Sequence, residues 1–121
     1  AARSIDRVVN VFPARRQEQI RTMLADSLRM IVSQRLVRTA EGNSRLAVAE
    51  VLVNTFAVAS MIRTGKTHNL DSAIQAGSQA GMQSLDSALR DLAQREVISG
   101  DEAYANAVDK SAFERFVARA A

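Results

Sequence analysis

The chain has 121 residues, of which 47% are hydrophobic and 24% are charged, a balance typical of a globular protein. Sixteen Lys and Arg residues against thirteen Asp and Glu residues leave a net charge of +3, too small and too dispersed to indicate nucleic-acid binding. With no Cys and one His, the composition excludes disulfides, thiolate zinc sites and multi-histidine metal sites, and no apolar run reaches the roughly 20 residues of a membrane span.

Two helices are predicted at the start of the chain. Ser4 is a suitable cap for a short helix, in which Ile5, Val8, Val9 and Phe12 follow at helical spacing. Pro13 suits the first turn of a second helix, which is expected to be the longest element. The apolar stripe of this second helix is expected to comprise Ile20, Leu24, Leu28, Ile31 and Val32.

A β-hairpin is predicted in the middle of the chain. Residues 45–53, "RLAVAEVLV", form an apolar run whose length and β-branched content favour a buried strand. Residues 34–38, "QRLVR", and the turn residues 41–43, "EGN", predict its partner. Because a lone hairpin is marginal in water, we expect a larger sheet outside this sequence. Glu50 within the run is interpreted as structural, paired or edge-exposed, because an unpaired buried carboxylate is costly.

From residue 54 onward the sequence reads as helical. Thr55 is expected to cap a helix over residues 56–64, which Gly65 ends in the left-handed conformation. Further helices are expected to begin at the caps Asn69, Ser84, Ser99 and Asp109. Ser99 and Glu102 have the spacing of a capping box. The predicted fold class is therefore α+β and mostly helical.

The stretch "MIRTGKTHN", residues 61–69, contains the "GKT" that ends the phosphate-binding loop of many ATPases. The full motif needs Gly where this chain has Ser60, and a strand rather than a helix in front. The amides of such a loop must face phosphate, whereas here helical hydrogen bonds are expected to use them. We predict a Gly-terminated helix without a phosphate site, and an exposed turn with no catalytic role for His68.

Five segments of the sequence resemble a known family in their order and spacing: "SIDRVVNVFP", "IRTMLADSLRMIVSQRLV", "RLAVAEVLVNT", "GMQSLDSALRDL" and "VISGDEA". They resemble the C-terminal part of the type IV pilus retraction ATPases, the PilT family of twitching motility proteins in the secretion ATPase superfamily. The resemblance implies that residues 1–53 are the end of a RecA-like P-loop ATPase core, with a long helix and a hairpin. Residues 54–121 would be a helical C-terminal subdomain.

The resemblance also implies a whole protein larger than this chain. Members of the family are hexameric motors that use ATP and Mg²⁺ to retract pili at the cytoplasmic face of the inner membrane, and their phosphate loop lies upstream of the matching region. This part is therefore expected to be inactive and to bind no cofactor or metal by itself. The expected partners are other subunits of the ring and the inner-membrane platform of the pilus, without nucleic acid or a membrane span. Exposed sheet edges could also let this part self-associate.

Two sets of site residues follow from the resemblance. Asn54, Thr55 and Phe56 would form a turn at the adenine side of the nucleotide pocket; the alternative is a capped helix start with Phe56 in the core. The signature helix of the family, A-I-R-N-L-I-R-E, corresponds to "AVASMIRT", residues 57–64. Its matching positions, expected to couple ATP turnover to retraction, are Ala57, Val58, Met61, Ile62 and Arg63. Arg63 would contact a neighbouring subunit or the pilus machinery; the alternative is an ordinary surface arginine.

Two features bear on the branch of the family. Related assembly ATPases carry an insertion with zinc-binding Cys-x-x-Cys pairs after "QRL", and the short connection here favours the retraction branch. However, Ala59, Ser60 and Thr64 replace three polar residues of the signature, and Thr55-Phe56 replaces the usual Thr-Pro. An accessory retraction paralogue therefore also fits.

The alternative from another class is a stand-alone basic helical module that binds nucleic acid. Its candidate residues are Arg15, Arg16, Arg21 and Arg29. Aromatic residues make up only 4% of the chain, and no recognition-helix motif is evident, so base stacking has little support. This interpretation ranks second.

Overall fold

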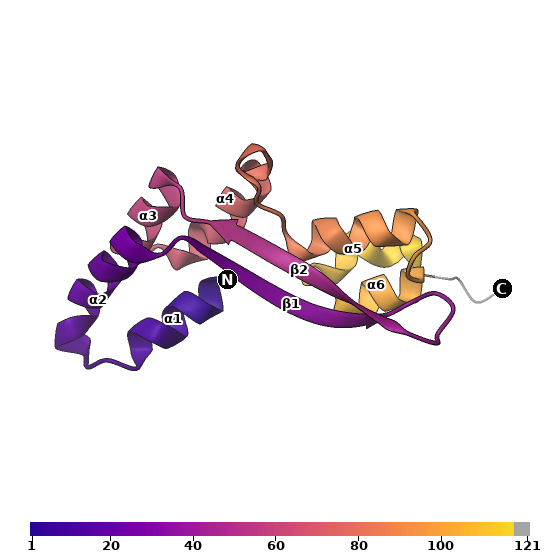
Figure 1. Cartoon of the computed structure of the whole chain (residues 1–121), viewed down its shortest axis with the longest axis horizontal. Coiled ribbons are helices and arrows are strands. Elements are labelled where there is room, and N and C mark those ends of the chain that lie inside the picture. Colours follow the sequence, from indigo (N-terminus) through magenta and orange to yellow (C-terminus); the bar gives the residue numbers. More distant parts are fainter. Residues whose placement is uncertain (118–121) are drawn as a thin grey trace. The chain divides into compact units, whose positions relative to one another are not determined.

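A computed structural model of the chain describes residues 1–117. This part is mostly helical and contains one antiparallel hairpin, which confirms the predicted mixture of elements (Figure 1). The α-helices are α1 (Ala2–Asn10), α2 (Ala14–Ser27), α3 (Phe56–Arg63), α4 (Leu70–Ala76), α5 (Leu85–Gln94) and α6 (Gly100–Asn106). The strands are β1 (Met30–Arg38) and β2 (Arg45–Val53), and short 3₁₀ helices are η1 (Thr67–Asn69), η2 (Ser78–Ala80) and η3 (Lys110–Phe116).

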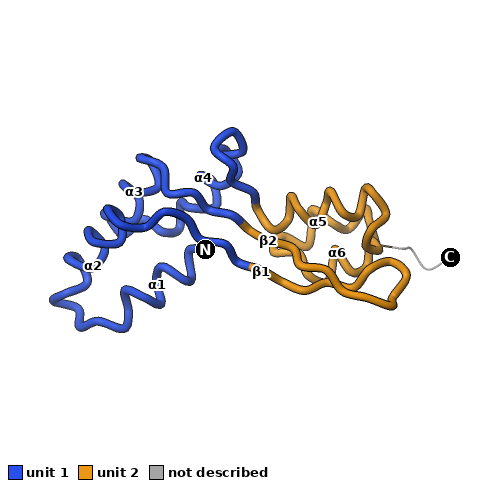
Figure 2. The backbone as a smooth tube through the Cα atoms, in the orientation of Figure 1, with its two compact units in different colours: residues 1–33, 51–83 blue, residues 34–50, 84–121 orange. Residues whose placement is uncertain are grey.

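The chain forms two compact units, each with its own core (Figure 2). Unit 1 consists of residues 1–33 and 51–83, and unit 2 consists of residues 34–50 with the described residues from 84 onward. Each unit therefore combines segments that are far apart in sequence, because the hairpin begins and ends in unit 1 and turns in unit 2. The predicted boundary between the end of an ATPase core, residues 1–53, and a helical subdomain, residues 54–121, refers to a larger protein. It stays a prediction.

The hairpin keeps one register from its base to its tip. At the base, the amide of Asn54 donates to the carbonyl of Arg29 at 2.9 Å, and at the tip the amide of Thr39 donates to the carbonyl of Ser44 at 3.0 Å. Both strands have nine residues, so the pairing between these two points contains no net insertion. Gly42 turns the chain with φ +77°, a conformation that glycine adopts without strain. The predicted hairpin is confirmed.

The boundary between α2 and β1 corrects one prediction. The apolar stripe was expected to remain helical as far as Val32, but α2 ends at Ser27 and Leu28 is already extended, with φ −65° and ψ 136°. Ile31 and Val32 lie in β1, where β-branched side chains are favoured and β2 supplies the backbone hydrogen-bond partners. Ile31 still packs against the core of unit 1, whereas Val32 is exposed, so the predicted core position is correct for Ile31 and wrong for Val32.

The core of unit 1 is aliphatic. Helices α2 and α3 pack against each other within it (Figure 1). Its buried residues are Ile5, Val9, Ala25, Leu52, Val58, Ile62, Leu70, Ile74 and Met82. An isolated antiparallel bridge between Val51 and Gln83 joins the end of β2 to the segment that follows η2. Helix α1 begins at Ala2, so Ser4 lies inside it and is not its cap.

The core of unit 2 lies under two capped helices. The hydroxyl of Ser84 accepts the amide of Ser87 at 3.0 Å and begins α5, and the hydroxyl of Ser99 accepts the amide of Glu102 at 3.0 Å and begins α6. Both caps were predicted and are confirmed. The buried residues are Val37, Val48, Leu85, Leu89, Ile98, Ala103, Ala107 and Phe113. A Cβ atom at Gly100 would collide with the carbonyl of Phe116, so this position requires glycine.

Three other capping predictions were wrong. The Glu102 carboxylate does not complete the capping box; it accepts the amide of Arg38 at 3.1 Å and the side-chain amide of Asn106 at 3.2 Å. Asn69 makes no capping hydrogen bond before α4. Asp109 makes none either, and the element after it is the 3₁₀ helix η3. In each case the side chain meets other partners or solvent, which spacing along the chain does not reveal.

Candidate functional site

Asn54 ties the turn before α3 to the end of α2. Its side-chain nitrogen donates to the carbonyls of Ala25 at 3.0 Å and Leu28 at 2.7 Å. Because both partners are acceptors, the nitrogen of the amide must face them. The Asn54 oxygen is buried without a hydrogen-bond partner, so the nitrogen alone holds the amide in place. These contacts satisfy carbonyls that the last turn of α2 leaves unpaired.

Thr55 and Phe56 complete the turn. The Thr55 hydroxyl accepts the amide of Val58 at 3.3 Å and caps α3, as predicted. The Phe56 side chain is 91% exposed. The alternative that placed Phe56 in the core is therefore wrong, because the first residue of α3 faces away from the core that Val58 and Ile62 enter. Packing within unit 1 does not explain why this turn exposes an aromatic ring to solvent.

The predicted coupling residues divide between two faces of α3. Val58 and Ile62 are fully buried and hold the helix on the core of unit 1. Met61 is half-buried, whereas Ala57 and Arg63 are exposed. Contact with another molecule at this helix would therefore involve Ala57, Arg63 and part of Met61.

Arg63 is not an isolated surface arginine. Its guanidinium donates to the carboxylate of Asp26 at 3.0 Å, and both side chains are partly exposed. This pair links the C-terminal end of α3 to the end of α2. A surface ion pair of this kind typically contributes about 0–1 kcal/mol, so its main effect is to orient the arginine.

The three divergent positions of the signature helix have simple structural roles. The Thr64 hydroxyl donates to the carbonyl of Ser60 at 2.8 Å, so two of these positions contact each other at the end of α3. Ala59 is half-buried and packs against the core of unit 1. None of the side chains at these three positions carries a charge.

The "GKT" segment closes the end of α3. The amide of Lys66 donates to the carbonyl of Met61 at 2.8 Å, and the amide of Gly65 donates to Ile62 at 3.2 Å. With Gly65 at φ +75°, this is the Schellman arrangement that ends many helices. The Thr67 hydroxyl donates to Asp6 at 3.0 Å. The amides of Gly65 and Lys66 are therefore used internally, which confirms the prediction of a helix end instead of a phosphate loop. His68 lies in η1 and is exposed, also as predicted.

The arginines proposed for nucleic-acid binding do not share one helix face. Arg15, Arg16 and Arg21 lie on α2, while Arg29 follows it. At about 100° per residue, Arg15 and Arg21 are about 120° apart around the helix axis. The Arg21 side chain also packs near Gly65. This arrangement does not favour a continuous basic stripe.

The described part of the chain contains neither a cluster of metal-ligating side chains nor a membrane-spanning helix. Residues 1–117 contain no group of three or more His, Cys, Asp or Glu side chains arranged to hold a metal ion. Within the same residues, no helix combines the length and the apolar character needed to cross a bilayer.

No family model matches the sequence. Known proteins do match it: a twitching motility protein from Neisseria gonorrhoeae is 40% identical over 103 residues, 85% of this chain and 28% of the relative. The type IV pilus retraction ATPase PilT from Pseudomonas aeruginosa is 42% identical over 103 residues, 85% of this chain and 30% of the relative. A solved structure, the pilus retraction motor PilT with bound ADP, superimposes with a TM-score of 0.81 at 30% identity, over 95% of this chain and 32% of that one.

The chain is a partial homologue of the type IV pilus ATPases. It spans only about 30% of the length of the relatives that it matches. The type IV pilus ATPase PilU from Pseudomonas aeruginosa is 38% identical over 107 residues, so identity alone does not separate PilT-like from PilU-like members. The ATPase DotB from Legionella pneumophila shares the fold at 20% identity, with a TM-score of 0.68.

The sequence of this pilus ATPase homologue did not reveal the hydrogen-bond partners that hold the candidate site in place. Thr55 and Gly65 were found because caps and helix ends have local signatures. Asp26 and the carbonyl of Ala25 could not be found in the same way, since they lie 37 and 29 residues from Arg63 and Asn54. An Asn between a strand and a helix is a weak signal for such a contact, because the same residue is common in turns.

Proposed function

We propose that this chain is the C-terminal part of a hexameric motor ATPase that powers pilus retraction at the cytoplasmic face of the inner membrane. Its role would be to complete the nucleotide-binding core, contact neighbouring subunits and transmit force to the pilus platform. The observation that carries the proposal is the 40–42% identity to twitching motility and pilus retraction proteins over 85% of the chain. In such a motor, ATP and Mg²⁺ are bound mainly by segments outside this chain.

We place the turn of Asn54, Thr55 and Phe56 at the adenine side of the nucleotide pocket. The exposed Phe56 ring supports this assignment, because an aromatic side chain can stack on a planar base and here has no partner inside unit 1. The anchored Asn54 supports it as well, since a rigid turn loses little conformational entropy on binding. The related PilT structure contains bound ADP.

The outward side of α3 is proposed as the coupling surface. Ala57, Met61 and Arg63 would contact a neighbouring subunit while Val58 and Ile62 hold the helix on the core. Rigid-body motion of one subunit against the next would then follow nucleotide state, because each state favours a different set of contacts. An accessory PilU-like role uses the same surface, so the proposal concerns the motor class and not the branch.

The isolated chain is expected to show no ATP hydrolysis with Mg²⁺ and at most weak nucleotide affinity. Changing Lys66 to Ala should leave this baseline unchanged, because its amide ends α3 and its side chain belongs to no phosphate loop. The measurement is phosphate release by the purified chain and its variant. Turnover that disappears in Lys66→Ala would contradict the proposal.

A chimera tests the proposed role directly. The matching segment of Pseudomonas aeruginosa PilT is replaced by this chain, and ATPase activity, assembly and nucleotide affinity are measured. We expect an active hexamer in which Phe56→Ala weakens adenine-nucleotide binding about fivefold to tenfold, a typical loss for one aromatic stacking contact. Val11→Ala is the matched control, because Val11 is also highly exposed in unit 1 and lies outside the turn. If the chimera assembles and hydrolyses ATP but Phe56→Ala leaves its affinity for adenine nucleotide unchanged, the adenine-side assignment is excluded.

A further inference from the structure

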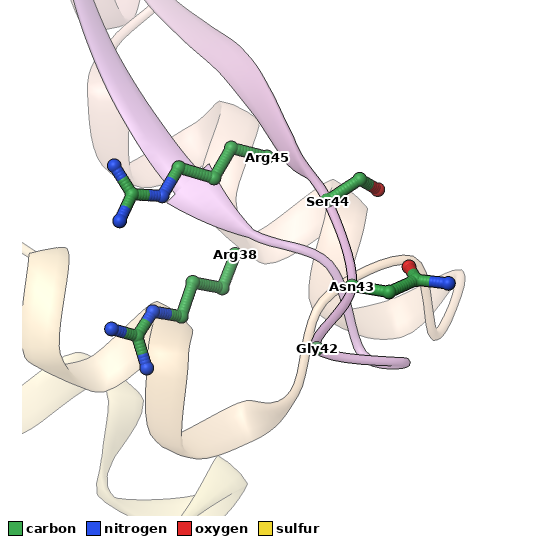
Figure 3. Close-up of a pocket in the computed structure, with 5 residues that line it drawn as sticks. All are labelled: Arg38, Gly42, Asn43, Ser44 and Arg45. Carbon is green, nitrogen blue, oxygen red and sulfur yellow. The ribbon is translucent and has the colours of Figure 1, made fainter.

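Two arginines face each other across the tip of the hairpin in unit 2. Arg38 is the last residue of β1 and Arg45 is the first residue of β2, and the register places them directly opposite. Both side chains extend toward the same side of the tip, whereas Asn43 and Ser44 extend toward the other (Figure 3). Arg38 and Arg45 line an open pocket of about 390 Å³ together with residues 42–44.

The two guanidinium groups are not held in ion pairs. Within residues 1–117, neither forms an ion pair with a carboxylate. The carboxylate of Glu102 lies close by, but it accepts hydrogen bonds from the Arg38 amide and from Asn106. Glu41, in the turn, also makes no ion pair with either arginine. Like charges directly opposite on paired strands repel each other, so an anion between them would relieve the repulsion.

The backbone that carries the pair is firmly held. The Thr39 amide donates to the Ser44 carbonyl at 3.0 Å, and the Gly42 amide donates to the Thr39 carbonyl at 2.9 Å. The hydroxyls of Thr39 and Ser44 lie 3.2 Å apart and share a hydrogen bond. The Ala40 amide donates to the Val97 carbonyl at 2.9 Å, which attaches the turn to the rest of unit 2. The two arginines are therefore presented on a preorganised turn and not on a loose loop.

The chemistry of the pair selects the anion. Each guanidinium offers a planar fork of N–H donors, and one fork satisfies both oxygens of a carboxylate. Two forks with two positive charges instead match a tetrahedral group with three or more oxygens and two negative charges. We propose that Arg38 and Arg45 bind a doubly charged phosphate group, either free phosphate or the phosphomonoester headgroup of an acidic lipid. This site is independent of the motor proposal, because it uses only residues of unit 2.

The first experiment follows the arginine side-chain N–H signals of the whole chain by NMR during a titration with inorganic phosphate at about pH 8, where phosphate groups are doubly charged. A sodium chloride titration of the same ionic strength is the reference. We expect the Arg38 and Arg45 signals to shift and saturate with phosphate only. Arg38→Gln and Arg45→Gln should each weaken binding about tenfold or more, because each removes a pair of charged hydrogen bonds.

Two further variants keep the result interpretable. Arg45→Lys retains the charge but loses the fork, so its affinity should lie between those of the wild type and Arg45→Gln. Arg3→Gln removes one charge from an exposed position in α1 and should leave phosphate affinity unchanged. No saturation, or an equal loss in Arg3→Gln, would overturn the site. Saturation with acetate as tight as with phosphate would overturn the assignment to phosphate.

Vesicles distinguish the source of the phosphate group. The chain is sedimented with phosphatidylcholine vesicles, with and without phosphatidic acid, whose headgroup is a phosphomonoester. Binding to the acidic vesicles that Arg38→Gln abolishes and Arg3→Gln retains would identify the lipid headgroup as a ligand. Saturation by inorganic phosphate without vesicle binding would identify free phosphate or a soluble phosphomonoester. Vesicle binding that both Arg38→Gln and Arg3→Gln retain would be unspecific electrostatic attraction. If inorganic phosphate also failed to saturate the site, the proposal would be rejected.

Discussion

Each of the two units contains a phenylalanine whose environment is the opposite of the other's. Unit 2 buries Phe113 completely, with the Phe116 ring 5.7 Å away and the Arg90 guanidinium 5.5 Å from its centroid. Unit 1 builds its core from aliphatic side chains and leaves Phe56 91% exposed. The difference shows that unit 1 does not need Phe56 for its own packing. That ring is therefore available for a contact outside the unit, as the proposed adenine-side turn requires.

The units also differ in how they hold their connecting segments. In unit 1, the side-chain amide of Asn54 joins the start of α3 to the end of α2. In unit 2, the carboxylate of Asp86 accepts the amides of Val108 at 2.8 Å and Asp109 at 3.0 Å and so fixes the segment before η3. Both arrangements satisfy backbone groups at helix ends. The one in unit 1 does so directly beside the candidate site, so it couples the position of the turn to α2.

The largest expected effect is that of Phe113→Ala in unit 2, with Phe56→Ala in unit 1 as the contrasting variant. Phe113→Ala removes a fully buried ring from unit 2 and should lower the free energy of unfolding by about 3–5 kcal/mol. Phe56→Ala should change it by no more than about 0.5 kcal/mol, because the ring is already in solvent. Urea unfolding measures both variants. A loss of several kcal/mol in Phe56→Ala would show that the ring packs within the chain and would remove the contrast between the units.

A smaller effect is expected when Asn54 is changed. Asn54→Ala removes the two hydrogen bonds to the carbonyls of Ala25 and Leu28 and should destabilise the chain by about 1–3 kcal/mol. Amide hydrogen exchange should rise at the end of α2 and at the start of α3. Asn10→Ala, at an exposed position at the end of α1, is the matched control. Equal exchange in the two variants would mean that Asn54 does not hold the turn.

The smallest expected effects concern the helix caps, of which each unit has at least one. Thr55→Ala in unit 1 and Ser84→Ala in unit 2 should each cost about 0.5–2 kcal/mol. Ser84→Ala should cost more, because the Ser84 bond is 3.0 Å long and the Thr55 bond is 3.3 Å. Unfolding experiments rank the two, and Ser72→Ala, at an exposed position of α4, provides a reference without a cap. Thr55→Ala as the costlier change would reverse the order and would point to a further role for its hydroxyl in unit 1.

Local signals in the sequence predicted much of the fold. The caps Thr55, Ser84 and Ser99 and the left-handed Gly65 were correct, because each depends on side chains within three or four residues. The hairpin was also correct, since a continuous apolar run rich in β-branched residues and the turn residues beside it are local signals too. For the candidate site, sequence predicted the positions of the turn and the helix but not which side chains remain exposed.

The sequence by itself determined the capped helices, the hairpin turn, the closed "GKT" segment and the resemblance to pilus ATPases. Tertiary structure alone decided that Ile31 and Val32 belong to a strand, because β2 supplies their backbone partners. It also decided that Phe56 faces solvent and that Asn54 reaches α2. The physical reason is distance along the chain: propensity and capping act within a few residues, whereas burial and pairing depend on segments that only folding brings together.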